Sequence, residues 1–139
     1  MTSSDATPGL LHHVELYVSH LERSRRFWQF LLENLGYYVF QEWASGFSFK
    51  LGPTYVVFVQ TEEAHQLPPY HRKQTGLNHF AFHARSRAHV DELTTALQER
   101  GVPILYADRH PFAGGDAHYA VYFEDPDRIK VEVVAPDAS

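Results

Sequence analysis

The chain has 139 residues, of which 44% are apolar and 21% charged, and it contains no cysteine. Length and composition predict one globular domain with its own core, and the missing cysteine excludes disulfides, thiolate metal ligands and a cysteine nucleophile. The formal net charge is −5 without a dense basic block, which argues against a nucleic-acid partner. No apolar run could span a bilayer and residues 1–8 lack a signal-peptide pattern, so we expect a cytoplasmic protein without membrane contact.

The first structural unit is predicted over residues 9–66, after a short tail at 1–8. A strand-like run at 11–18 precedes apolar residues at helical spacing between Leu21 and Leu35. Gly36 predicts the end of this helix, and strand patterns follow at 37–40, 47–51 and 55–60. The first half therefore predicts a strand, a helix and three further strands.

The second half repeats this order over residues 77–136. A strand pattern at 77–83 precedes a helix from about Ala88, and Gly101 is followed by strand patterns at 104–106, 119–123 and 129–134. His13 and His79 are 66 residues apart, and Gly36 and Gly101 are 65 apart. Residues 67–76, in a polar stretch containing two prolines, are predicted to link the halves. The sequence thus predicts an α+β fold in which two tandem βαβββ modules form a single domain over residues 1–139.

Strand alternation places one histidine of each half on the face of its strand opposite the apolar side chains. Because neighbouring side chains in a strand point to opposite faces, His13 lies opposite the apolar set of its strand. The same rule places His79 opposite Phe80, and Glu132 opposite Val131. Two imidazoles and one carboxylate leave coordination positions open on a divalent ion, which favours a catalytic site over a structural one. Zn, Ni, Mn, Co and Fe all accept these ligands.

Three segments resemble the vicinal oxygen chelate superfamily, which includes glyoxalase I, extradiol dioxygenases, fosfomycin-resistance enzymes and bleomycin-binding proteins. They are residues 13–19, residues 77–82 and residues 121–127 with Lys130-Val131-Glu132 behind them. The resemblance implies a curved sheet around a metal cavity, the ligands His13, His79 and Glu132, and a small oxygenated substrate that chelates the ion. It favours a lyase or isomerase of the glyoxalase type, with Glu132 or a metal-bound hydroxide carrying the proton.

Departures from the family patterns keep alternatives open. Alignment with glyoxalase I puts Phe58 at the place of a fourth ligand, with Glu42, Gln60 or Glu62 as substitutes in another register. An Fe(II) extradiol dioxygenase is the alternative, although His118 lies too near Val121, and His110 too far from it, to match that family's acid–base histidine. A fosfomycin- or bleomycin-resistance type of antibiotic-modifying or drug-binding protein is a further alternative.

Other side chains and the assembly complete the expectations. Tyr122 shares a strand face with Ala120 and His118, and it is a candidate to donate a hydrogen bond to an oxyanion. Exposed sheet edges favour a homodimer with two equivalent metal sites. Of the ten histidines in the chain, four are expected to be ordinary surface residues: His20, His65, His71 and His89.

Overall fold

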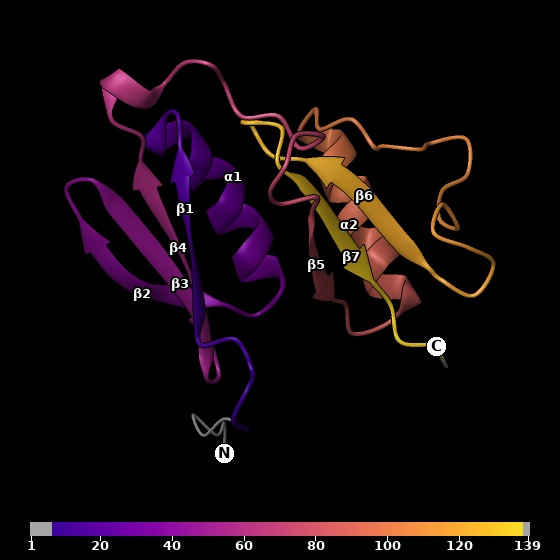
Figure 1. Cartoon of the computed structure of the whole chain (residues 1–139). Helices are drawn as coiled ribbons and strands as arrows, with labels where there is room; N and C mark the ends of the chain where they lie inside the picture. Colours follow the sequence, from indigo (N-terminus) through magenta and orange to yellow (C-terminus); the bar gives the residue numbers. More distant parts are fainter. Residues whose placement is uncertain (1–6, 138–139) are drawn as a thin grey trace. The chain divides into compact units, whose positions relative to one another are not determined.

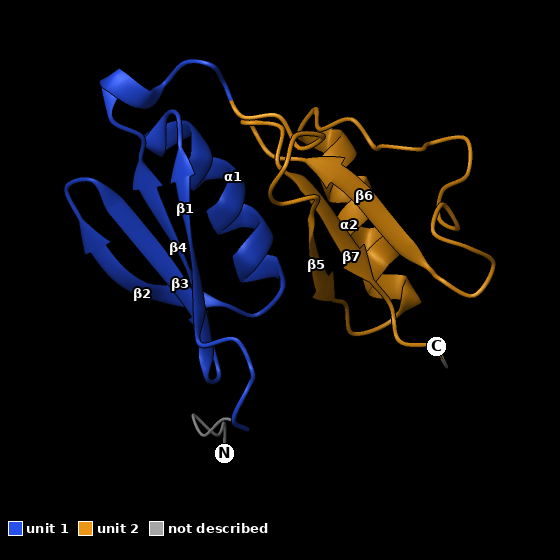
Figure 2. Cartoon of the chain, in the orientation of Figure 1, with its two compact units in different colours: residues 1–69 blue, residues 70–139 orange. Residues whose placement is uncertain are grey.

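The computed structural model describes residues 7–137, and the chain separates between residues 69 and 70 into two compact units (Figure 2). This boundary falls inside the predicted linker at 67–76. Most of the predicted tail lies outside the described residues. Within the described range, no helix is long and apolar enough to cross a membrane.

The first unit is a four-stranded sheet covered by one helix (Figure 1). Its elements are β1 (His13–Val18), α1 (Leu21–Asn34), β2 (Tyr38–Trp43), β3 (Gly46–Leu51), β4 (Thr54–Gln60) and the short 3-10 helix η1 (Glu63–His65). The strand order is β1-β4-β3-β2, with β1 parallel to β4 and the other pairs antiparallel. The strand, helix and three strands predicted for the first half are confirmed.

Helix α1 is fixed at both ends and along one face. The side chain of His20 accepts a hydrogen bond from the backbone N–H of Arg23 at 3.3 Å, which caps the first turn. Trp28 is fully buried, and its ring lies 4.9 Å from the ring of Phe58 in β4. Gly36 then adopts a φ of 98°, the left-handed conformation that ends helices at low cost. Capping and burial together explain why the helix covers this stretch.

Side chains of β1 alternate between the helix side and the opposite face. Val18 is buried, whereas His13, Glu15 and Tyr17 are exposed. In the parallel pairing with β4, His13 lies opposite Tyr55. The predicted separation of His13 from the apolar set of this strand is therefore observed in the first unit.

The second unit has three strands and one helix: β5 (Phe80–His83), α2 (Arg87–Glu99), β6 (Ala120–Glu124) and β7 (Lys130–Val134). The order is β5-β7-β6, with β5 parallel and β6 antiparallel to the central β7. The core contains these fully buried residues of helix and sheet: Val90, Leu93, Leu97, Val121, Phe123, Val131 and Val133. The face of the sheet that carries Val131 and Val133 is therefore the apolar one.

The strand predicted at 104–106 is wrong. Ile104 forms a single bridge to Phe123, and Leu105 donates one backbone hydrogen bond to the carbonyl of Tyr122 at 2.8 Å. Tyr106 then takes a φ of 56°, which turns the chain out of the extended conformation. The described part of the second sheet consequently has three strands instead of the expected four.

His89 is not a surface residue as expected, because its ring is buried. Its Nδ1 accepts a hydrogen bond from the backbone N–H of Arg85 at 3.0 Å, ahead of helix α2. This imidazole has a structural role at the start of α2, where Ser86 is the cap.

Candidate functional site

Glu132 is the centre of a polar cluster on the second sheet. It lies in the middle strand β7, opposite Ala81 of β5 and Tyr122 of β6. Directly paired residues share a sheet face, so all three lie opposite the apolar face of Val131 and Val133. The side chain of Glu132 is only 6% exposed. A carboxylate this buried needs polar partners, since removing a charge from water is costly.

His79 is the first of these partners. It precedes Ala81 by two residues, which gives it the same face, and its Nε2 lies 3.0 Å from Oε1 of Glu132. Its Nδ1 lies 2.7 Å from Oδ1 of Asn78. An amide oxygen carries no hydrogen, so Nδ1 is the donor, and the Nε2 of a neutral ring is then an acceptor. Two acceptor atoms thus face each other, an arrangement that is satisfied by a proton or a metal cation between them.

His118 is the residue that sequence reasoning did not assign to the site. Its Nε2 contacts Oε2 of Glu132, the oxygen that His79 does not touch. It lies two residues before Ala120 and four before Tyr122, at the entry to β6. The sequence placed His118 on this face by alternation, but carried no signal that it would reach the carboxylate of another strand.

Tyr122 completes the surroundings of Glu132. Burial, the charge of Glu132 and a hydrogen bond with its carboxylate raise the pKa of Tyr122 to about 12. The hydroxyl is therefore protonated at neutral pH and can act as a hydrogen-bond donor. The ring meets the ring of His79 edge-on, with centroids 6.3 Å apart.

Gly114 closes one side of this cluster. A Cβ atom at this position would lie 2.5 Å from Cδ2 of His118 and 2.7 Å from the hydroxyl oxygen of Tyr122. Both distances are well inside van der Waals contact. The backbone of Gly114 therefore packs directly on two side chains of the site, and a larger residue would displace them.

His13 belongs to the first unit. Its ring stacks on Tyr55 with centroids 4.7 Å apart and planes within 3°. Its Nδ1 lies 2.9 Å from Nδ1 of His12, and the His12 ring also contacts Tyr55. Because β1 begins at His13, strict alternation does not apply to His12, and the two rings lie together instead of on opposite faces. The Nδ1 contact with His12 leaves Nε2 as the other ring nitrogen of His13.

The structure offers no fourth ligand at the position proposed from alignment. Phe58 is fully buried on the helix side, while Val57 and Val59 are the residues of β4 that pair with the exposed face of β1. Gln60 uses its side-chain oxygen to accept from the backbone N–H of Leu21 at 2.8 Å. Glu42 forms a 2.6 Å ion pair with Arg25.

Among residues 7–137, no three His, Asp or Glu side chains are arranged around one point that could hold a metal ion. In the second unit His79 and His118 surround the carboxylate of Glu132 rather than a common centre. The donor atoms are nitrogen and oxygen, which suit divalent transition metals.

Two α+β units with imidazole and carboxylate groups on the sheet face opposite the helix define a glyoxalase-type protein. Residues 10–133 match the Glyoxalase/Bleomycin resistance protein/Dioxygenase superfamily, and the chain belongs to this family.

Three individual proteins are similar to this chain. It is 59% identical to the uncharacterized protein YqjT of Bacillus subtilis, over 91% of this chain and 98% of that protein. A candidate glyoxalase from Bacillus halodurans with a crystal structure is 65% identical, with a TM-score of 0.92 over 93% of this chain and 97% of that one. The fosfomycin resistance protein FosX of Listeria monocytogenes, solved as a mutant with Mn(II) and 1S,2S-dihydroxypropylphosphonic acid, shares the fold. Its identity is 20% and its TM-score 0.67, over 93% of each chain.

Proposed function

We propose that the protein is a metal-dependent enzyme of the glyoxalase type, a lyase or isomerase that acts on a small oxygenated molecule. A divalent ion is held by His13, His79 and Glu132. The observation that carries the proposal is the approach of Nε2 of His79 to Oε1 of Glu132, 3.0 Å apart on a largely buried carboxylate. Zn, Ni, Mn, Co and Fe all suit these ligands, and FosX, which shares the fold, was solved with Mn(II).

The bound ion supplies Lewis acidity to adjacent oxygens of the substrate. Asn78 orients the ring of His79 through Nδ1, as outer partners of metal-binding histidines commonly do. Glu132 is the group that accepts and returns a proton on the substrate carbon. Tyr122 is protonated at neutral pH and donates a hydrogen bond to an oxyanion beside Glu132.

An Fe(II) extradiol dioxygenase is the second candidate, and one observation favours it. That chemistry requires an acid–base histidine. His118 does not have the spacing of that family's histidine, but it lies against both Glu132 and Gly114 beside Tyr122. Loss of catechol under air, dependent on ferrous iron and abolished in His118→Ala, would select the dioxygenase over the lyase or isomerase.

Elemental analysis of protein purified without added metal tests the proposed function. Wild-type protein is expected to hold about one equivalent of a divalent metal per chain. The His79→Ala protein is expected to lose the metal but remain folded, because catalytic sites usually tolerate loss of their ion. His83→Ala is the matched control, because His83 is exposed on the same face of β5 and lies outside the cluster. A His79→Ala protein that binds metal with wild-type affinity would refute the ligand assignment.

The protein is further proposed to be a cytoplasmic homodimer. Mixing His13→Ala with His79→Ala protein under subunit exchange tests how the site is composed. Recovered metal binding requires ligands from two chains, whereas no recovery despite demonstrated exchange assigns each site to one chain. Sedimentation of a monomer alone at micromolar concentration would disprove the dimer.

A further inference from the structure

We propose that Lys130 and Tyr106 form a binding subsite for an anionic group of the substrate, so that the enzyme acts on a small oxyanion such as a carboxylate or a phosphate ester. This inference rests on the proposed function, because Glu132 on the same strand then acts on the other end of the molecule. Lys130 and Glu132 are two residues apart in β7 and share a face, which separates them by about 6.6 Å along the strand. One compact molecule can therefore contact both.

The geometry of the pair is built by a strained turn. Nζ of Lys130 donates a hydrogen bond to the hydroxyl oxygen of Tyr106 at 2.7 Å. Tyr106 reaches this place with a φ of 56°, a conformation that costs energy for a residue with a side chain and that often marks functional positions. The preceding hydrogen bond from Leu105 to the carbonyl of Tyr122 anchors the turn to β6.

The pair adjoins the Glu132 cluster directly. The rings of Tyr106 and Tyr122 meet edge-on with centroids 5.5 Å apart. Nζ of Lys130 lies 4.8 Å from the ring centroid of Tyr106 and 5.2 Å from that of Tyr122. The ammonium group therefore lies beside both tyrosine rings, and Tyr122 also forms a hydrogen bond with Glu132.

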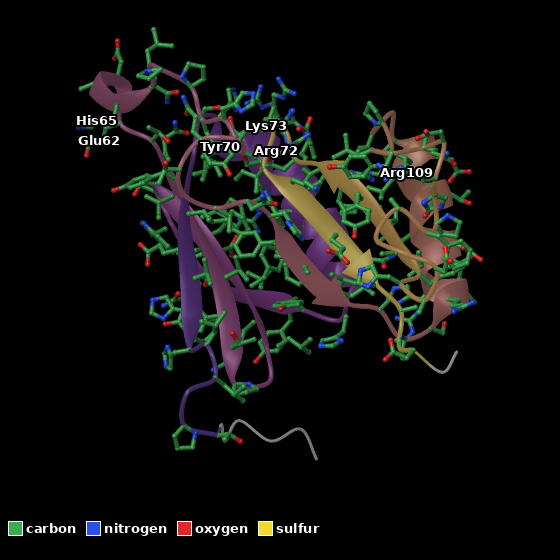
Figure 3. All side chains as sticks on the ribbon, turned by 45° about the vertical axis from the view of Figure 1, so that its right-hand side comes forward. Glu62, His65, Tyr70, Arg72, Lys73 and Arg109 are labelled. Carbon is green, nitrogen blue, oxygen red and sulfur yellow. The ribbon has the colours of Figure 1, made fainter. Side chains whose placement is uncertain are left out.

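Positive charge is concentrated around Tyr106. The hydrogen bond from Lys130 and the charges of Lys130, Arg72 and Lys73 lower the pKa of its phenol, against a smaller effect of burial. Figure 3 labels Arg72 and Lys73 close to the start of the yellow strand, β7. The guanidinium of Arg109 lies 5.3 Å from the ring of Tyr106. Because Arg72 also pairs with Glu124, the positive charge that attracts an anion comes mainly from Lys130, Lys73 and Arg109.

Glu124, a carboxylate on this face, is already engaged by arginines. One of its oxygens lies 2.8 Å from Nε of Arg72, and the other lies 3.5 Å from Nε of Arg128. Glu124 lies opposite Lys130 in the pairing of β6 with β7. Because two guanidinium groups neutralise its charge, Glu124 makes the electrostatic potential at the subsite less negative than an unpaired carboxylate would. The ammonium of Lys130 can then act as a point charge for an oxyanion.

Anion binding is tested on the full chain stripped of metal, so that failure of the metal site cannot mask the result. Backbone amide resonances are followed by NMR while inorganic phosphate or acetate replaces chloride at constant ionic strength. Saturable shifts at Tyr106 and Lys130 are expected. Lys130→Met is expected to raise the phosphate Kd by roughly tenfold, which is about 1.4 kcal/mol, because a charge-assisted contact is lost.

Lys50→Met is the matched control, since Lys50 also lies on a strand with its ammonium 4.5 Å from an aromatic ring, that of Phe40. Its phosphate Kd is expected to match the wild type. If Lys130→Met does not fold, Tyr106→Phe replaces it, and weaker phosphate binding is again expected. Tighter binding of phosphate assigns a phosphate-type substrate, and tighter binding of acetate assigns a carboxylate. The absence of saturable shifts in the wild type, or wild-type affinity in the folded Lys130 variant, overturns the subsite whatever the metal analysis shows.

Discussion

Replacing Glu132 by Gln separates the effect of the carboxylate on the free energy of unfolding from its effect on metal binding. Gln keeps the size of the side chain but removes the charge that contacts His79, His118 and Tyr122. Hydrogen bonds to a charged group are worth about 1.5–3 kcal/mol each. Burying that charge costs several kcal/mol, and Glu132 is 6% exposed. The two effects oppose each other, so without metal the free energy of unfolding should change by less than about 2 kcal/mol.

Metal changes the comparison because only the folded wild type binds it. At a free metal concentration of about 100 times Kd, the wild type should gain about 2.7 kcal/mol in the free energy of unfolding. The Glu132→Gln protein should gain almost none. Urea unfolding with a chelator and with each divalent ion measures both quantities. Glu124→Gln is the control, because Glu124 lies on the same face but is held by Arg72, and it should retain the gain. An equal metal-dependent gain in Glu132→Gln would refute the role of this carboxylate.

The same contacts lead to three further predictions. In alkaline titration of metal-free protein by ultraviolet absorbance, Tyr106→Phe should remove a tyrosine that ionises below 10.0 and Tyr122→Phe one near about 12. The contribution of Tyr106 to the free energy of unfolding is fully present above its unfolded pKa and is lost as pH falls through its lower folded pKa. The contribution of Tyr122 is present below 10.0 and is lost as pH rises towards about 12. If Tyr122 ionised at a lower pH than Tyr106, the charge arrangement described above would be contradicted. His13→Ala should abolish metal binding while His12→Ala weakens it, and calorimetric titration showing loss in His12→Ala alone would exchange their roles. Gly114→Ala should lower the free energy of unfolding by about 1–3 kcal/mol, measured in urea, because its Cβ overlaps side chains of the site; unchanged stability and metal affinity would mean that the loop yields freely.

The strands and helices that carry strong periodicity were predictable from the sequence. Apolar spacing between Leu21 and Leu35 and the stop at Gly36 determine α1, because burial of one helical face and a left-handed residue after it are local properties. Alternation likewise determined which face Glu132 occupies in β7. The segment at 104–106 was mispredicted because its apolar residues look like a strand, and the left-handed conformation of Tyr106 has no signature in a tyrosine.

By itself the sequence determined the two-unit organisation and the faces of His79 and Glu132, since these depend on periods of two and 3.6 residues along the chain. The family followed from the resemblance of residues 13–19, 77–82 and 121–132 to its motifs. Tertiary structure decided what those faces bring together. The contact of His118 with Glu132 depends on antiparallel pairing of β6 with β7, and the approach of Lys130 to Tyr106 depends on a turn between α2 and β6. Both join residues whose separation in the sequence carries no periodic signal, because strand register and loop path are fixed by packing of the whole unit.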